Sequence, residues 1–528
     1  MKKLLLILVF ACFFTTLFAQ IHEVEGVQMG LWNYETVLVT GDVIIPEGEQ
    51  LTIAPGTNVV FNGYYSLLVE GSLNAIGTVT DTIFFRVADS TGFAANLFGQ
   101  EGSWNGLEIK QLPDSDSTLI QYCHFSNAKA VGDTLVSNGG AIYIRKSERV
   151  AIRNCRFDRN YSFYSGGAVF VDISSILIHN CVFTNNLAGS GHIDYKRGWG
   201  GGLACRYSNS TLFGLEFYDN VATGFGGGLS LEHCDVAASN CLFHDNEAYF
   251  GGAFSEMYTI KPKNSCSNFI MYNNHAGAFG GAIASLASER ALYNNFTIAN
   301  NYCGMGNAIF LSRESNPIFT NCIIRGNETG NALVWLWDQN AKPEFYYCNV
   351  EGETASFAGI GNLWIYENGD GEDPLFADAA NFNFSLSSNS PCIDMGKPDT
   401  AGLALPSYDF VMGKRIGNNR IDLGAFEFST AGFSDYQAKN TDISVSVFPN
   451  PLQYNSFCAI DLQQESLATV QIYSVGGKLL WQNETTRFQQ GKHELSLHPF
   501  LTKKQASNTV YVLVVNTEKS KTTIKLLY

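Results

Sequence analysis

The chain has 528 residues, too many for one ordinary globular domain but compatible with a repeat array, because repeats add length without adding separate cores. Its 33 basic and 49 acidic residues leave a net charge of −16, which argues against nucleic acid or an anionic membrane as a partner. Beyond the N-terminal leader, no stretch approaches the roughly eighteen apolar residues of a membrane span, so we expect no transmembrane segment in the mature chain.

Residues 1–19 have the pattern of a secretory signal peptide. Two lysines precede an apolar run, and the small residue Ala19 stands before Gln20 at the expected cleavage position. We therefore expect this leader to be removed and the mature chain to be exported.

Residues 20–110 are expected to form an N-terminal cap and the first coils of a repeat array. Residues 37–61 (VLVTGDVIIPEGEQLTIAPGTNVVF) alternate apolar and polar positions between glycine turns, which is typical of short strands.

Residues 111–350 contain a motif that recurs about every 26 residues. Seven copies of a Cys-x-Phe-x-x-Asn pattern, with substitutions at the first and third positions, start 26, 34, 26, 28, 27 and 26 residues apart. Glycine pairs followed by Ala or Leu lie between the copies in the same phase. Each period holds only a few short strands, so equivalent strands must stack into parallel sheets to bury an apolar face. Because parallel crossovers are right-handed, the expected fold is all-β: a right-handed parallel β-helix followed by a small C-terminal β-sandwich.

The period places equivalent side chains of successive coils about 4.8 Å apart. Asparagine tolerates a tight bend, and stacked amides can hydrogen-bond along the axis, so we expect a structural ladder rather than a binding row. Cysteine exchanges with Leu and Phe at one position, which favours a packed column of reduced thiols over disulfides. The ladder residues are Asn160, Asn186, Asn220, Asn246, Asn274, Asn301 and Asn327, and the cysteines are Cys155, Cys181, Cys241 and Cys322.

These motifs resemble known bacterial families. The opening coils are similar to right-handed β-helix proteins of the Bacteroidetes, and the repeats resemble those of chlamydial polymorphic outer membrane proteins. Residues 351–430 are expected to hold the last coils and a closing module. There, Ser390–Asp394 (SPCID), Asp409, Arg415 and Asp422–Glu427 (DLGAFE) are similar to a choice-of-anchor module. We expect it to cover the unpaired edge of the last coil.

After a linker at residues 431–440, residues 441–528 alternate like the strands of a small β-sandwich. They also resemble the C-terminal sorting domain of the type IX secretion system, with Pro449, Asn450 and Pro451 in its opening signature and Gly476 and Gly477 in a hairpin. The resemblance implies the secretion machinery and the surface attachment apparatus as partners. It also implies a location outside the cell or on the extracellular side of the outer membrane.

The best candidates for chemistry are two carboxylates. Asp219 and Asp245 each precede a ladder asparagine in consecutive coils, so they should stack and could share a calcium ion or have separated pKa values. Other coils have Arg, Asn or Gly at this position, which favours a solvent-facing turn. We expect no cofactor other than such a calcium ion, because the sequence has no zinc-binding spacing, phosphate loop or nucleophile elbow.

A second candidate is an insertion of eight residues that breaks the period between Cys181 and Leu215. Insertions in solenoids map to one face, often the binding face, although a merely variable loop is the alternative. Its interaction-prone residues are His192, Asp194, Tyr195, Lys196, Arg197 and Trp199.

The segment from Tyr258 to Asn264, together with Trp335 and Trp337, offers further basic and aromatic side chains. Three functions therefore stay open, because fold alone does not decide function. We favour adhesion or binding of extracellular glycans or surface proteins. The alternatives are a polysaccharide lyase or glycoside hydrolase, and a purely structural surface protein.

Overall fold

The computed structural model describes most of the chain after residue 20. The described residues are 21–78, 81–113, 115–132, 137–190, 198–259, 264–327, 332–361, 365–411, 413–417, 420–428, 443–448, 457–474, 479–483, 485–497, 500, 510–517 and 521–527.

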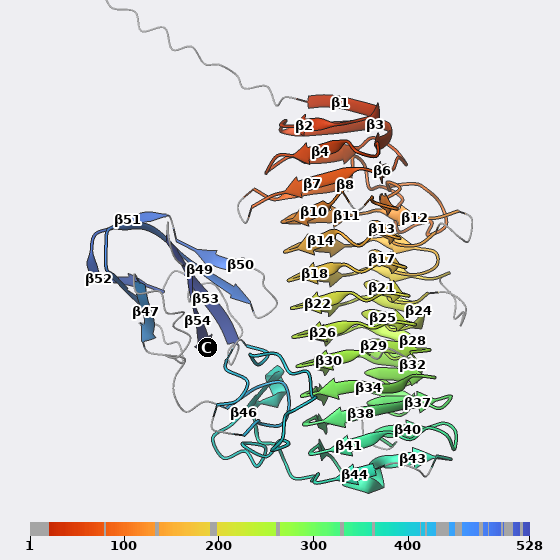
Figure 1. Ribbon diagram of the computed structural model, residues 1–528, viewed down its shortest axis with the longest axis vertical. Coiled ribbons are helices and arrows are strands. Elements are labelled where there is room, and N and C mark those ends of the chain that lie inside the picture. Colours follow the sequence, from red (N-terminus) through yellow and green to blue (C-terminus); the bar gives the residue numbers. More distant parts are fainter. Residues whose placement is uncertain are drawn as a thin grey trace, which may run out of the picture.

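Stacked coils form a long column from the N-terminus to about residue 370 (Figure 1). A regular coil contributes one strand to each of four parallel sheets, here called sheets 1 to 4 in chain order. One such coil comprises β17 (Val169–Asp172), β18 (Leu177–His179), β19 (Val182–Thr184) and β20 (Leu187–Ala188). Each of these strands pairs in register with its equivalent one coil later. This repeat of short parallel strands confirms the predicted β-helix.

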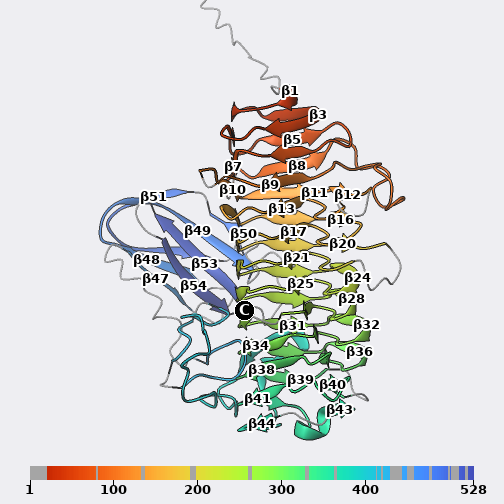
Figure 2. The same ribbon diagram turned by 45° about the vertical axis from the view of Figure 1, so that its right-hand side comes forward.

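The four sheets differ in length within the described residues. Sheet 2 has thirteen strands, from β2 (Gly30–Trp32) to β44 (Ile365–Glu367). Sheet 4 has seven, from β12 (Lys129–Ala130) to β36 (Tyr302–Met305), and follows one side of the column (Figure 2). Sheets 1 and 3 join at the first coils, because β3 (Thr36–Ile45) pairs with both β5 (Asn58–Phe61) of sheet 3 and β6 (Leu67–Val69) of sheet 1.

The inside of the column is apolar. Phe157, Phe183, Phe217 and Phe243 are fully buried and stack with ring centroids 4.8–4.9 Å apart, which is the spacing of the strands that carry them. The predicted column of cysteines lies beside them. All twelve cysteines in the described part of the chain are buried free thiols.

The asparagines at the end of the sheet 3 strands form a buried ladder. The Nδ2 amide of Asn160 donates to Oδ1 of Asn186 at 3.0 Å, and the same bond joins each asparagine to the next as far as Asn327. That Oδ1 atom also accepts the backbone N–H of the preceding asparagine. Because the residue before each asparagine has a left-handed backbone, the chain turns inward and places each amide inside the column.

The closing module lies along the side of the lower coils and not over their end, contrary to the expectation from the sequence (Figure 1). Its ordered strands are β45 (Phe376–Asp378) and β46 (Asn383–Leu386). Phe384, Val411 and Phe426 of the module pack against Ile270 and Ala299 on the outer face of sheet 3. The module finds an apolar surface here because Ile270, Ala299 and Ile323 all point outward from sheet 3 in these lower coils.

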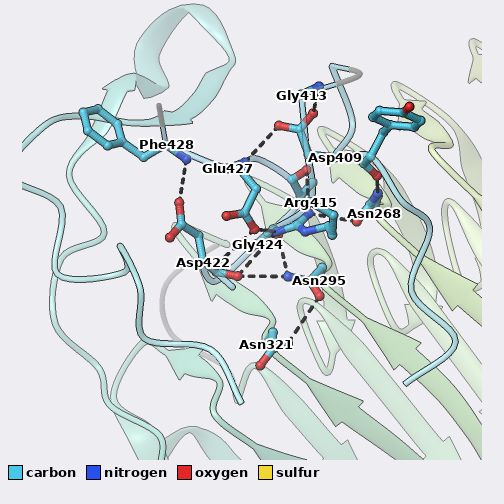
Figure 3. Close-up of polar contacts among 12 residues, drawn as sticks. Asn268, Asn295, Asn321, Asp409, Gly413, Arg415, Asp422, Gly424, Glu427 and Phe428 are labelled. Atoms are coloured by element: carbon cyan, nitrogen blue, oxygen red, sulfur yellow. Dashed lines mark hydrogen bonds and ion pairs between the residues drawn. The ribbon is translucent and has the colours of Figure 1, made fainter. Parts of the chain in front are cut away.

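Polar contacts fasten the module to the turns between sheets 2 and 3 (Figure 3). Arg415, whose side chain is 2% exposed, donates to Asn268 Oδ1 at 2.9 Å and to Glu427 Oε1 at 2.5 Å. Asn295 donates to the backbone carbonyls of Asp422 and Gly424. The residues that carry the family resemblance therefore bind the module to the coils.

The C-terminal domain consists of two small antiparallel sheets around one core, as predicted. One contains β47 (Ile443–Phe448), β48 (Phe457–Leu462) and β52 (Gly491–Ser496). The other contains β49 (Ser466–Ser474), β50 (Leu479–Gln482), β51 (Thr486–Phe488), β53 (Val510–Thr517) and β54 (Lys521–Leu527). The sorting signature Pro449, Asn450, Pro451, Gly476 and Gly477 lies outside the described residues, as does the leader 1–19.

One carboxyl group faces the interior of the column. Glu256 in β29 (Phe254–Met257) pairs in register with Leu231 and Ser285 and is fully buried. Tyr293 donates to its Oε2 atom, whereas its Oε1 atom has no hydrogen-bond partner in the described part of the chain. Burial raises the pKa of Glu256 because a low dielectric disfavours the charged form.

We expect Asn220→Ala to lower the free energy of unfolding by about 1–3 kcal/mol, because it removes the acceptor of the buried Asn186 backbone N–H and the donor to the Phe183 carbonyl. Denaturant unfolding of the purified chain measures this change. Thr211→Ala, at an exposed position of the neighbouring sheet 2 strand, is the control. Equal stability of the two variants would show that the ladder contributes nothing.

We expect Glu256→Gln to stabilise the chain increasingly as pH rises. Some carboxyl groups have a higher pKa in the folded chain than in the unfolded chain. Such a group contributes stability at a pH below its unfolded pKa, and this contribution is lost as the pH rises through its folded pKa. At about pH 8 the variant should be more stable than wild type by about 1–3 kcal/mol, and the gap should narrow toward about pH 5. Unfolding curves at several pH values test this, with the exposed Glu289→Gln as control; a gap independent of pH would contradict it.

Candidate functional site

The two carboxylates predicted from the sequence lie on exposed turns. Asp219 and Asp245 have left-handed backbones at φ 54° and 55°. Asp245 Oδ2 lies 2.7 Å from Nδ1 of His244, whose ring stacks between Tyr218 and Tyr272 at 5.0 Å from each. Burial acts to lower the pKa of His244, but hydrogen bonds to Asp245 and Glu216 raise it to about 9. Asp245 therefore stabilises the protonated form of His244 within a stack of rings. The described residues contain no group of three His, Cys, Asp or Glu that could hold a metal ion.

Of the insertion residues, only Trp199 is described; His192, Asp194, Tyr195, Lys196 and Arg197 lie outside the described residues. Trp199 is half-buried and forms backbone bridges to Ser165 and Phe225. Its ring meets that of Phe225 edge-on at 6.4 Å, and its buried Nε1 atom has no hydrogen-bond partner among the described residues.

Trp199 belongs to a hydrophobic cluster on the outside of sheet 1, which we call the outer aromatic face. Sheet 1 has small outward residues here, Ser230, Ser255 and Ala284. Large rings from the ends of the sheet 4 strands and from later coils therefore have room to lie over the sheet. The face comprises Trp199, Phe225, Phe250, Met257, Tyr258, Phe279, Ala284, Leu286, Phe310, Trp335 and Trp337.

The outer aromatic face brings together three segments that the sequence had marked separately. Trp199 comes from the insertion, Tyr258 from the basic segment, and Trp335 and Trp337 from the strand 136 residues after Trp199. Trp337 is 49% exposed, and its ring lies 5.4 Å from that of Phe279.

Three phenylalanines of this face were missed in the sequence. Phe225, Phe250 and Phe279 stack with centroids 4.6 and 5.2 Å apart. Each stands immediately before a glycine with a φ of 62–67°, as Trp199 does before Gly200. An aromatic residue directly before the glycine pair in four consecutive coils was the signal that could have revealed this row.

A second row of rings borders sheet 1 at the other end of its strands. Tyr207, His233 and Tyr258 stack with centroids 4.8 and 5.4 Å apart. Tyr207 is 54% exposed at one end of this stack. At the other end, Arg313 donates to the Tyr258 hydroxyl at 2.8 Å.

A charged column lies between the two aromatic rows. Asp172, Arg206 and Glu232 are register partners in three consecutive coils, and Arg206 Nε donates to Asp172 Oδ1 at 2.9 Å. The Arg206 guanidinium also lies over the ring of Phe170, 5.3 Å from its centroid. Burial raises the pKa of Glu232, although Arg206 opposes this, and the buried Oε2 atom has no hydrogen-bond partner in the described structure. The sequence motifs had identified none of these three charged residues.

The architecture agrees with the comparison to protein families. The family model described as the right-handed beta helix region matches residues 39–255 and 196–355. The chain belongs to the right-handed β-helix family. The model of the secretion system C-terminal sorting domain matches residues 446–528, which identifies the domain that follows this β-helix.

The sorting domain makes this β-helix protein a secreted or cell-surface protein with the type IX secretion machinery as its export partner. Among the described residues, no helix has the length and hydropathy needed to cross a membrane. No curated protein matches the chain.

Proposed function

We propose that this secreted β-helix is an adhesin-like protein that binds extracellular glycans through its outer aromatic face and the adjoining row of rings formed by Tyr207, His233 and Tyr258. The observation that carries the proposal is the convergence of Trp199, Tyr258, Trp335 and Trp337 on the outside of one sheet. Trp337 is exposed and the other three rings are half-buried, so the face presents aromatic surface to a ligand.

The chemistry of this face suits a sugar polymer. Rings provide apolar contact with the C–H faces of sugars, and nearby charged groups such as Glu232 and Arg206 supply hydrogen bonds to hydroxyl groups. Tyr207 and Trp337 are five coils apart, about 24 Å at the normal strand spacing. A ligand that contacts both is therefore an extended chain.

The charged column favours binding over hydrolysis. A glycoside hydrolase needs two carboxyl groups that reach the scissile bond, one as acid and one as base or nucleophile. Asp172 is only 1% exposed and is hydrogen-bonded to Arg206, which stands between it and Glu232 in register. Such an arrangement holds Arg206 in place beside the aromatic rings.

We expect Tyr207→Ala and Trp337→Ala each to weaken glycan binding by roughly 1–3 kcal/mol, the scale of a binding hot spot, with little change in thermal stability. A glycan array with the purified mature chain identifies the ligand, and calorimetry with that ligand measures the loss. Tyr302→Ala is the matched control, because Tyr302 is 42% exposed at the start of a sheet 4 strand, whereas the rings of the face come from the opposite ends of these strands. Loss in the control equal to that in the two variants, or no glycan bound by wild type, would contradict the proposal.

We expect deletion of residues 435–528 to abolish delivery to the surface while leaving the β-helix folded. The removed segment has its own core, and its family is that of a sorting domain. Cell fractionation in the native host measures delivery, and circular dichroism of the truncated chain checks the fold. Normal surface levels of the truncated protein would show that export does not depend on this domain.

A further inference from the structure

One coil of this acidic protein is strongly basic. Six of the chain's 33 basic residues lie between positions 145 and 159, with only Glu148 and Asp158 to oppose them, which leaves this coil with a charge of +4. The basic residues are Arg145, Lys146, Arg149, Arg153, Arg156 and Arg159.

Four of the arginines follow one another along two successive strands and the corner between them. Arg149 and Arg153 flank and end the sheet 2 strand β14 (Val150–Arg153), and Arg156 begins the sheet 3 strand β15 (Arg156–Asp158). Asn154, with a φ of 53°, makes the turn between these strands. Arg159 follows β15 directly, so the four side chains form a band along one coil.

The neighbouring coils add two histidines to this band. His124 is the register partner of Arg156, and His179 is the register partner of Arg153. Each histidine therefore lies in the coil next to that of its arginine partner, and the two strands are about 4.8 Å apart. We call these six residues, Arg149, Arg153, Arg156, Arg159, His124 and His179, the arginine band.

The band is accessible and only partly neutralised. Arg153 is exposed and has no carboxylate partner in the described part of the chain, and the Arg159 side chain is 62% exposed beside Asp158. Arg156 donates to the hydroxyl of Tyr218 at 3.0 Å, a neutral partner that leaves its charge in place. The sorting domain lies beside the column (Figure 1), and Arg153 and Arg159 are both exposed in its presence.

We propose that the arginine band is a second ligand site, which binds an acidic extracellular polysaccharide carrying carboxylate or sulfate groups. Guanidinium groups bind such oxyanions through paired hydrogen bonds, and a polymer with repeated anionic groups can contact several arginines of one band at once. The stacked rings of His179 and Phe213, 4.8 Å apart, add apolar contact next to Arg153. The band lies on sheets 2 and 3, so this site is independent of the outer aromatic face on sheet 1.

A polysaccharide fits the site better than a nucleic acid does. The basic region is confined to one coil, while the rest of the chain is acidic and repels a long polyanion that extends beyond the band. A flexible glycan with charges spaced along it can place a few of them on the band and leave the remainder in solvent. We therefore treat nucleic-acid binding as an outcome that would overturn the proposal.

The two histidines add a pH dependence to the site. Burial lowers the pKa of His124, with Asp158 opposing and Arg156 and Arg159 reinforcing the shift, and its ring lies against that of Phe84. Burial and Arg153 lower the pKa of His179. These shifts favour the neutral imidazoles, whereas a bound anion favours the protonated forms. Affinity should therefore rise as the pH is lowered.

The test measures binding of the purified mature chain to polygalacturonate and heparin by calorimetry, at about 50 and 150 mM NaCl. Dextran serves as the neutral polymer, and a single-stranded DNA oligonucleotide as the polyanion that is not a glycan. We expect Arg153→Gln/Arg159→Gln to weaken binding of the acidic polymers at least about tenfold. The slope of log affinity against log salt concentration should become shallower by about two, because two fewer ions are released. The matched control is Arg290→Gln/Lys342→Gln, which removes two exposed basic side chains from the lower coils and should change affinity less than about twofold.

Three results would overturn the proposal: no binding of either acidic polymer, equal loss in the two double variants, or DNA bound as tightly as the polysaccharides. Tyr207→Ala and Trp337→Ala leave the arginine band intact and should retain this binding. Failure of the arginine site and failure of the outer aromatic face are therefore separate results. Circular dichroism of each double variant confirms that its coils are folded.

Discussion

In-register pairing of parallel strands is the constraint on which the rest of this structure depends. It places every side chain about one strand spacing above its equivalent in the next coil, so that each sequence position becomes a column. The phenylalanine stack and the asparagine ladder share this geometry. In the ladder, each amide both donates to and accepts from its neighbours, so one asparagine satisfies groups in two other coils. A single position is therefore stabilised by the same residue type in adjacent coils.

The same constraint explains how the outside of the column is divided. Along sheet 3, the first outward position changes from coil to coil, and it is Ile270 and Ile323 in two of the lower coils. The closing module packs against these two isoleucines. Arg415 is buried where the module meets the coils, and its contacts with Asn268 and Glu427 offset the cost of removing a charge from water.

Sheet 1 uses a different combination of columns. Small residues at its first outward position allow rings from the sheet 4 ends to fold over it, and these rings stack at the coil spacing. In a row of stacked rings, the inner rings present only their edges to solvent, and only the two end rings present a face. Tyr207, at the end of one such stack, is exposed, and Trp337 is exposed against the edge of Phe279. A binding surface built in this way is long and repetitive, which suits a polymer more than a compact ligand.

The sequence by itself determined the repeat, the fold class, the sorting domain and the columns of Asn and Cys, because a motif that recurs about every 26 residues is visible in each copy without knowledge of the tertiary structure. It also marked Trp199, Tyr258, Trp335 and Trp337, but as unrelated candidates. Only the tertiary structure placed them on one face. Outward side chains become neighbours according to where each of the four strands begins within its coil, and the sequence does not show those starting points. The tertiary structure also decided that the module covers the side of the coils. The position of the module depends on contacts between outward apolar residues of the coils, such as Ile270 and Ile323, and apolar residues of the module that are far away in the chain.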